Sequence, residues 1–174
     1  MTHTLRAAAL FLLAYAPLAS AGELRGQVLD LLNAYEDTAT PEELRALGPK
    51  VDTELMHIAD DHDVPSSRRS RAITALGHFP GDKVKGFLEA HAKKADKGIL
   101  RRKAVWSLAV AYGEGALPVL TDALADDDAL LRVAAAQALG QVRSDASAEA
   151  LRARLAKEDQ DAVREAITKA LEAK

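Results

Sequence analysis

The sequence predicts an all-α protein, built as a short α-solenoid in which antiparallel helix pairs stack on one another. The first support is a recurring sequence motif, called the repeat phrase below, with apolar residues three, four and seven positions after an arginine. Residues at these offsets lie on one face of a helix. The second is the period: Arg69, Arg101, Arg132 and Arg164 are 32, 31 and 32 residues apart, a spacing typical of stacked-repeat proteins. The third is composition, since the sequence has no strand-like alternation and only 4% aromatic residues.

Residues 1–21 are predicted to be a cleaved secretory signal. Arg6 is a lone positive charge before an apolar run of about 13 residues. Pro17 then breaks the helix, and Ala19 and Ala21 supply the small side chains that signal peptidase requires. Cleavage after Ala21 would leave the protein periplasmic or secreted, with no transmembrane anchor. A short membrane anchor is one alternative, but spanning a bilayer takes about 20 apolar residues. A buried core helix is another, and the small-residue ending argues against it.

The composition of residues 22–174 limits the function classes. Without the signal, 22 basic residues face 26 acidic ones, a formal charge of −4. This mild negative charge gives no overall attraction to nucleic acid. The absence of Cys excludes disulfides, thiol chemistry, iron–sulfur clusters, covalently attached haem and a lipid-modified cysteine anchor. The length fits one repeat domain.

Residues 22–62 are expected to form a divergent N-terminal unit. Its first helix is predicted over Glu23–Tyr35, and its second over Pro41–Ile58 with a bend at Gly48-Pro49. Thr40 and Glu43 have the spacing of a capping box at the start of the second helix. The unit is about 13 residues longer than one period, as expected for an atypical capping unit at the end of a stack.

Three regular units follow, at residues 63–95, 96–125 and 126–158, and one unpaired final helix lies within 159–174. The first helices are predicted near Ser67–Leu76, from Asp96 to Tyr112, and from Asp126 onward. Second helices are marked by Val84, Phe87, Leu88 and Ala92, by Leu117, Leu120 and Leu124, and by Leu151 and Leu155. Leu120 and Leu151 are 31 residues apart, so the second helices share the period. The final helix is predicted over Ala162–Ala173.

The phrase D-x-D-x-x-x-R-x-x-A-A-x-A-L-G, from Asp126 to Gly140, resembles a HEAT repeat, and specifically the short variant of phycobilin lyases. The pattern is incomplete elsewhere: Pro65 and Lys97 stand in the place of Asp128, and Ile167 in that of the second alanine. The resemblance implies a right-handed superhelix of the HEAT-like or armadillo type. It also implies that the repeat arginines and aspartates are structural and tie one repeat's turn to the next. The family implies a scaffold that binds proteins, without a catalytic motif.

One position stands out as a candidate partner-binding residue. Five residues after each arginine, a position that points away from the core, the sequence reads Thr74, Trp106, Gln137 and Lys169. Trp106 is therefore a large aromatic on an otherwise polar face. Lys103 and Val110 share its face, and Arg71 and His78 lie one repeat away. We predict an interface hot spot from these five residues, since tryptophan flanked by cations is typical of one. The alternative is that Trp106 tilts and covers a groove between repeats.

The charge is also uneven along the chain. Residues 68–103 hold eleven Lys and Arg against Asp82, Glu89 and Asp96. One interpretation is a cationic patch that binds an anionic envelope polymer, a lipid surface or an acidic protein. The other is a set of solvated helix faces together with structural arginines.

His57 and His62, together with Asp60, Asp61 and Asp63, are considered as candidate ligands of a divalent metal. The two histidines are five residues apart, about 140° around a helix, so they do not share a face, and a helix end entering a polar loop is favoured. The sequence also shows no Ser/His/Asp arrangement, phosphate loop or zinc-ribbon spacing.

The sequence therefore predicts an exported HEAT-like scaffold for protein–protein interaction, with no catalysis, cofactor or metal. Binding of an anionic polymer or lipid through residues 68–103 is the alternative, and a lyase-like or metal-dependent enzyme is a remote one. The unpaired final helix is a further candidate for docking on another chain.

Overall fold

The structure is a computed structural model, described here for residues 21–33 and 39–172. Residues 1–20 of the predicted signal and the end of the predicted first helix lie outside the described residues. The helices are α1 (Ala21–Leu31), α2 (Pro41–Ala46), α3 (Val51–Asp60), α4 (Ser66–Leu76), α5 (Asp82–Lys94), α6 (Gly98–Tyr112), the short 3₁₀ helix η1 (Gly113–Ala116), α7 (Leu117–Leu124), α8 (Ala129–Val142), α9 (Asp145–Leu155) and α10 (Asp161–Glu172). Within these two ranges there is no β-strand.

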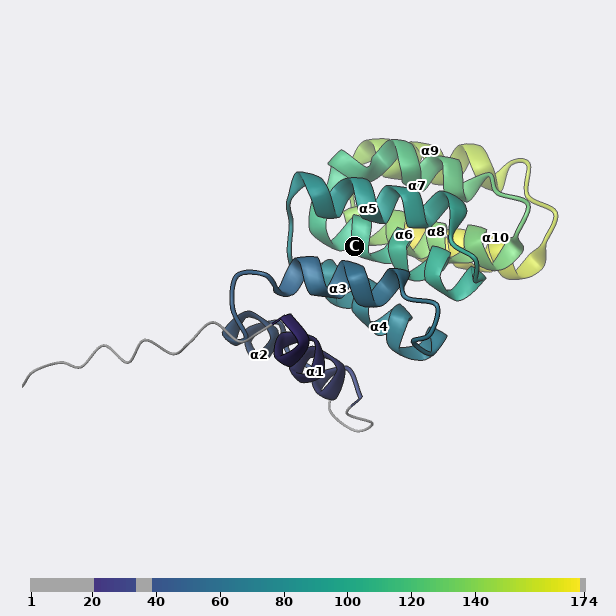
Figure 1. Cartoon of the computed structure of the whole chain (residues 1–174). Coiled ribbons are helices and arrows are strands. Elements are labelled where there is room, and N and C mark those ends of the chain that lie inside the picture. Colours follow the sequence, from purple (N-terminus) through teal and green to yellow (C-terminus); the bar gives the residue numbers. More distant parts are fainter. Residues whose placement is uncertain (1–20, 34–38, 173–174) are drawn as a thin grey trace, which may run out of the picture.

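The helices form two layers (Figure 1). Helices α4, α6, α8 and α10 pack side by side in succession, and we call them the first-helix layer. Helices α3, α5, α7 and α9 form the second-helix layer, each antiparallel to its partner in the first. Helix α1 packs against α3 at the N-terminal end of the stack. The predicted all-α solenoid of helix pairs is therefore confirmed.

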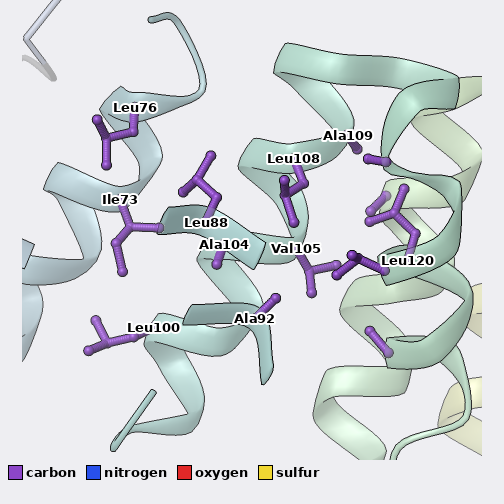
Figure 2. Packing of buried hydrophobic residues seen from close by; sticks show 14 of the residues in the cluster. Ile73, Leu76, Leu88, Ala92, Leu100, Ala104, Val105, Leu108, Ala109 and Leu120 are labelled. Carbon is purple, nitrogen blue, oxygen red and sulfur yellow. The ribbon is translucent and has the colours of Figure 1, made fainter. Parts of the chain in front are cut away.

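The core lies between the two layers and is made by the residues that the repeat phrase places there. The positions three, four and seven residues after Arg69 and Arg101 are fully buried, and Figure 2 shows Ile73 and Leu76 of α4 and Val105 and Leu108 of α6 among the packed side chains. These positions are Ala72, Ile73 and Leu76, and then Ala104, Val105 and Leu108. Second helices contribute Leu88 and Leu120 from the other side. Each buried Leu or Ile stabilises the fold by roughly 1.5–3 kcal/mol through burial of apolar surface.

Neighbouring first helices approach closely because their contact positions are small. A Cβ placed on Gly77 would lie 3.3 Å from Ser107 Cα of the next first helix, and one on Gly140 would lie 2.8 Å from Ala170 Cβ. Ser107 also donates a hydrogen bond from its Oγ to the carbonyl of Ile73 at 2.9 Å. The glycines therefore allow a backbone-to-backbone approach that side chains would prevent.

The N-terminal unit differs from its prediction at one point. The capping box forms as expected, with the Glu43 amide donating to Thr40 Oγ1 at 3.2 Å and the Thr40 amide donating to Glu43 Oε2 at 2.8 Å. The predicted long second helix is instead two helices, α2 and α3, because the chain turns at Gly48 with φ of 119°. A positive φ of this kind is open to glycine and ends a helix.

One described stretch, Gly98–Leu124, is long and apolar enough to cross a membrane by length and composition alone. It comprises α6, η1 and α7. Leu100, Val105, Leu108 and Leu120 of this stretch are fully buried in the stack. These side chains belong to the core between the two layers.

Candidate functional site

Three of the four repeat arginines, Arg69, Arg101 and Arg132, form a ladder of ion pairs along the stack. The Arg69 guanidinium donates to both carboxylate oxygens of Asp96, at 3.2 and 3.1 Å. Arg101 forms the same bidentate pair of hydrogen bonds with the carboxylate of Asp126. Arg132 donates to Glu158 at 2.9 and 3.0 Å. In each case the carboxylate lies in the turn just before the next first helix, so one arginine ties its own helix to the turn that leads into the next one.

The same arginines also bond to backbone carbonyls at the end of the preceding helix. Arg69 Nε donates to the Ala59 carbonyl at 2.8 Å, and Arg101 Nε to that of Ala92 at 3.1 Å. Carbonyls at a helix C-terminus lack intrahelical donors, so these bonds cap α3 and α5. The structural role that the family resemblance implied for these arginines matches their contacts.

Glu158 is the most strongly held member of the ladder, and the sequence analysis did not single it out. Its side chain is buried and accepts hydrogen bonds from Arg132 and, through Nε at 2.8 Å, from Arg154. The bond from Arg132 is the main reason that the pKa of Glu158 falls from 4.5 to about 2, and the bond from Arg154 adds to it. In the same way, the Arg101 hydrogen bond lowers the pKa of Asp126.

Three of the five predicted partner-binding residues line one hollow. We call it the α1–α4 groove, a cavity of about 590 Å³ between the N-terminal unit, α4 and α6. It is lined by Leu31, Leu32, Ala39, Thr40, Pro41, Leu44, Ser67, Ser70, Arg71, Thr74, Ala75, His78 and Lys103. Arg71 donates from Nη1 to the Leu32 carbonyl at 2.7 Å, which ties α4 to the end of α1. His78 is exposed at the other end of the hollow, and Lys103 reaches it from α6.

Trp106 borders a second hollow on the other side of α6. We call it the Trp106 groove, a cavity of about 340 Å³ lined by Trp106, Gln137, Gly140, Gln141, Arg143, Ala166, Lys169 and Ala170. The side chain of Trp106 thus leans toward α8 while 37% of its surface stays exposed. Val110, one turn further along α6, is 39% exposed and lies beside it on the same face. Trp106 therefore borders a groove and remains accessible, and the interface hot spot stays a prediction.

Leu130 was missed by the sequence analysis. It is 60% exposed at the start of α8. Seven residues separate Leu130 from Gln137, two helical turns, so the two side chains share the outward face of α8. The same two-turn offset would have identified it from sequence.

The cations of residues 68–103 are divided between the layers. Arg69 and Arg101 belong to the ladder, and Arg68 donates to Asn33 at 2.9 Å. Lys83, Lys85, Lys93 and Lys94 lie on α5 in the second-helix layer, whereas Arg102 and Lys103 lie on α6 in the first. Helices that follow one another in sequence enter opposite layers, so the segment does not form one continuous patch.

The acidic and histidine residues of the weighed metal site bind separate partners. His57 lies 3.6 Å from Glu54, and His62 lies 3.4 Å from Asp96. Asp60 contacts His91 Nε2 at 3.2 Å, and Asp61 pairs with Arg25. Among residues 21–33 and 39–172, no group of three or more His, Cys, Asp and Glu side chains is placed to hold a metal ion.

The layered helix pairs and the arginine ladder define an α-solenoid scaffold in which each repeat is fixed to the next. Residues 99–172 match the family model of HEAT repeats. Residues 99–172 are therefore identified as HEAT repeats. The match is to HEAT repeats in general, and the short phycobilin-lyase variant stays a prediction.

Solved structures share the fold at low sequence identity. Human deoxyhypusine hydroxylase in complex with glycerol is 22% identical with a TM-score of 0.59, and the alignment covers 87% of this chain and 62% of that one. The chain thus spans about three fifths of that enzyme. An engineered protein is 20% identical with a TM-score of 0.47, over 87% of this chain and 79% of the other. The comparison with curated proteins finds no match.

Proposed function

We propose that this chain is an exported HEAT-repeat scaffold that binds a protein partner through the outward face of its first-helix layer, without catalysis of its own. The observation that carries the proposal is the exposed apolar pair Trp106 and Val110 between two grooves. Both side chains exceed one third exposure. A tryptophan held in a groove rim and still open to solvent is the residue type that most often anchors a protein interface.

A catalytic role has less support in the described residues. The likeness to deoxyhypusine hydroxylase concerns the fold, and this chain spans 62% of that enzyme. The side chains with acid–base or ligand chemistry are engaged elsewhere: the buried acid Glu158 binds two arginines, and the half-buried His91 contacts Asp60. An active site requires such groups to converge on one substrate position.

The export part of the proposal rests on residues 1–21. Expression of the whole chain in a bacterium, followed by intact mass measurement of the recovered protein, tests it. We expect a mass that corresponds to residues 22–174. Recovery of the uncleaved chain from the cytoplasm would remove export from the proposal.

The binding part is tested by affinity capture from a cell-envelope extract, with Trp106→Ala and Val110→Glu as variants. Lys94→Ala is the matched control, because Lys94 is exposed on α5 in the opposite layer. We expect one protein to be retained by the wild type and the control and lost with both variants. Equal retention by all four proteins would reject the assigned face.

A further inference from the structure

We infer that the face around Trp106 accepts an acidic peptide segment of the partner, with an apolar side chain of that segment packed against Trp106. This inference rests on the proposed function and specifies the partner's chemistry. We call the surface the Trp106 face, and it consists of the α1–α4 groove, the outward side of α6 and the Trp106 groove.

The charge of the Trp106 face is opposite to that of the whole chain. The protein has 26 acidic and 23 basic residues, yet among residues 21–33 and 39–172 no Asp or Glu lines either groove of this face. Three further hollows of the described surface each include at least one aspartate, namely Asp52, Asp145, or Asp122 with Asp126. A cationic surface on an acidic protein favours an anionic partner and accelerates its association.

Two cations of this face are open to a ligand. Within residues 21–33 and 39–172, the side chains of Lys103 and Arg143 neither donate a hydrogen bond nor form an ion pair. Lys103 lies on the α1–α4 side of α6, and Arg143 follows the end of α8 on the other side of Trp106. Lys169 contributes less, because its Nζ is 2.6 Å from Glu165. The two open cations therefore flank the tryptophan.

The remaining groups of the face suit a peptide. Gln137 and Gln141 lie one turn apart on α8 and line the Trp106 groove. A carboxamide both donates and accepts, as a peptide group does, so these side chains match the backbone of an extended segment. A lipid surface would need its cations on one broad plane, whereas here they lie in hollows on either side of α6.

A library of random 12-residue peptides, selected on the whole chain as recovered from expression, tests the inference. Trp106 is the only tryptophan in the sequence, so its fluorescence reports directly on occupancy of the face. We expect the selected peptides to combine Asp or Glu with Leu, Ile or Phe and to shift the Trp106 emission to shorter wavelength. Selection of basic peptides, or of none that changes the emission, would overturn the inference.

Charge-reversal variants supply the control. Lys103→Glu combined with Arg143→Glu should weaken the selected peptide about tenfold, since exposed ion pairs contribute a few tenths to 1 kcal/mol each and reversal adds repulsion. Lys83→Glu combined with Lys94→Glu changes the net charge equally on α5 and should leave the affinity within twofold. Equal weakening by both pairs would show that only net charge matters and would reject the site.

Other occupants are tested with the same fluorescence signal. Vesicles of phosphatidylglycerol that shift the Trp106 emission without peptide would point to a membrane instead. A shift that depends on protein concentration would point to a second copy. If a captured partner requires Trp106 but not Lys103 and Arg143, the inference of an acidic peptide is wrong while the proposed function stands. The proposed function fails if no captured protein requires Trp106.

Discussion

Replacing Glu158 with glutamine should destabilise the stack more than any other single removal of a charge on the ladder. As whole residues, Glu158 is 4% exposed and its partner Arg132 is 7% exposed. Glu158→Gln keeps the shape but removes the carboxylate that accepts from Arg132 and Arg154. Two guanidinium groups then lose the negative charge that they surround, and leaving such a charge uncompensated is costly.

The lowered pKa gives the magnitude. A carboxyl group whose pKa is 4.5 in the unfolded chain and about 2 in the folded protein contributes roughly 3 kcal/mol at neutral pH, at about 1.4 kcal/mol per pH unit. For a domain of this size, that loss lowers the melting temperature by roughly 6–12 °C. Urea unfolding at pH 7, followed by circular dichroism, measures it as a lower midpoint with an unchanged slope.

The pH dependence provides the specific signature. Because the folded pKa is depressed, the contribution is fully present above pH 4.5 and is lost as the pH falls toward 2. The stability difference between wild type and Glu158→Gln should therefore shrink between pH 5 and pH 2. Glu165→Gln is the control, because Glu165 pairs with Lys169 at the surface, and it should leave the midpoint unchanged within error. A Glu158→Gln midpoint equal to that of the control would refute the reasoning.

Three further substitutions test the packing, the cap and the Trp106 face. Gly140→Ala should destabilise the protein by about 1–3 kcal/mol, because its Cβ would lie 2.8 Å from Ala170 Cβ. Gly86→Ala, whose Cβ would meet nothing within 4 Å, should instead stabilise the protein by up to about 1 kcal/mol. Thermal melts of both variants check this, and an unchanged melting temperature for Gly140→Ala would contradict the close approach. Thr40→Ala should lose about 1 kcal/mol of capping energy and increase amide hydrogen exchange in α2; unchanged exchange would show that the cap is dispensable. Trp106→Ala should keep the helical circular dichroism signal of the wild type, and a loss of helicity would show that Trp106 is a core residue.

Much of the fold follows from the repeat period. The positions three, four and seven residues after Arg69, Arg101 and Arg132 are a helical face, so periodicity predicts their burial, as Ile73 and Leu108 show. Gly77 ends α4 as its lack of a Cβ and low helix propensity suggest. The break at Gly48 was harder, because Gly-Pro is compatible with either a bend or an interruption. The positive φ at Gly48, which separates α2 from α3, decides between them.

The candidate site was only partly predictable. Counting charges along residues 68–103 suggested one patch, but consecutive helices enter opposite layers, which separates Lys94 from Lys103. Glu158 was not identified from the sequence because the acid that pairs with each arginine lies 25 to 27 residues after it. This spacing varies with loop length, so it does not form a fixed motif. The outward position of Trp106 was correct, since it needs only the helical angle.

The role of the final helix also changes with the structure. Its outward side chains in the described part are polar or small, among them Glu165, Thr168 and Lys169. Val163 and Ile167 are fully buried against the preceding repeat. The described part of α10 therefore lacks the exposed large apolar side chains that the Trp106 face offers.

The measurement that bears most directly on the account is quantitative capture from cell-envelope extract by the wild type, Trp106→Ala and the α5 control Lys94→Ala, with folding of all three verified by circular dichroism. The account predicts a partner that is retained by the wild type and the control and lost from Trp106→Ala. Equal retention of every captured protein by the three samples would contradict it, because the scaffold would then bind through another surface.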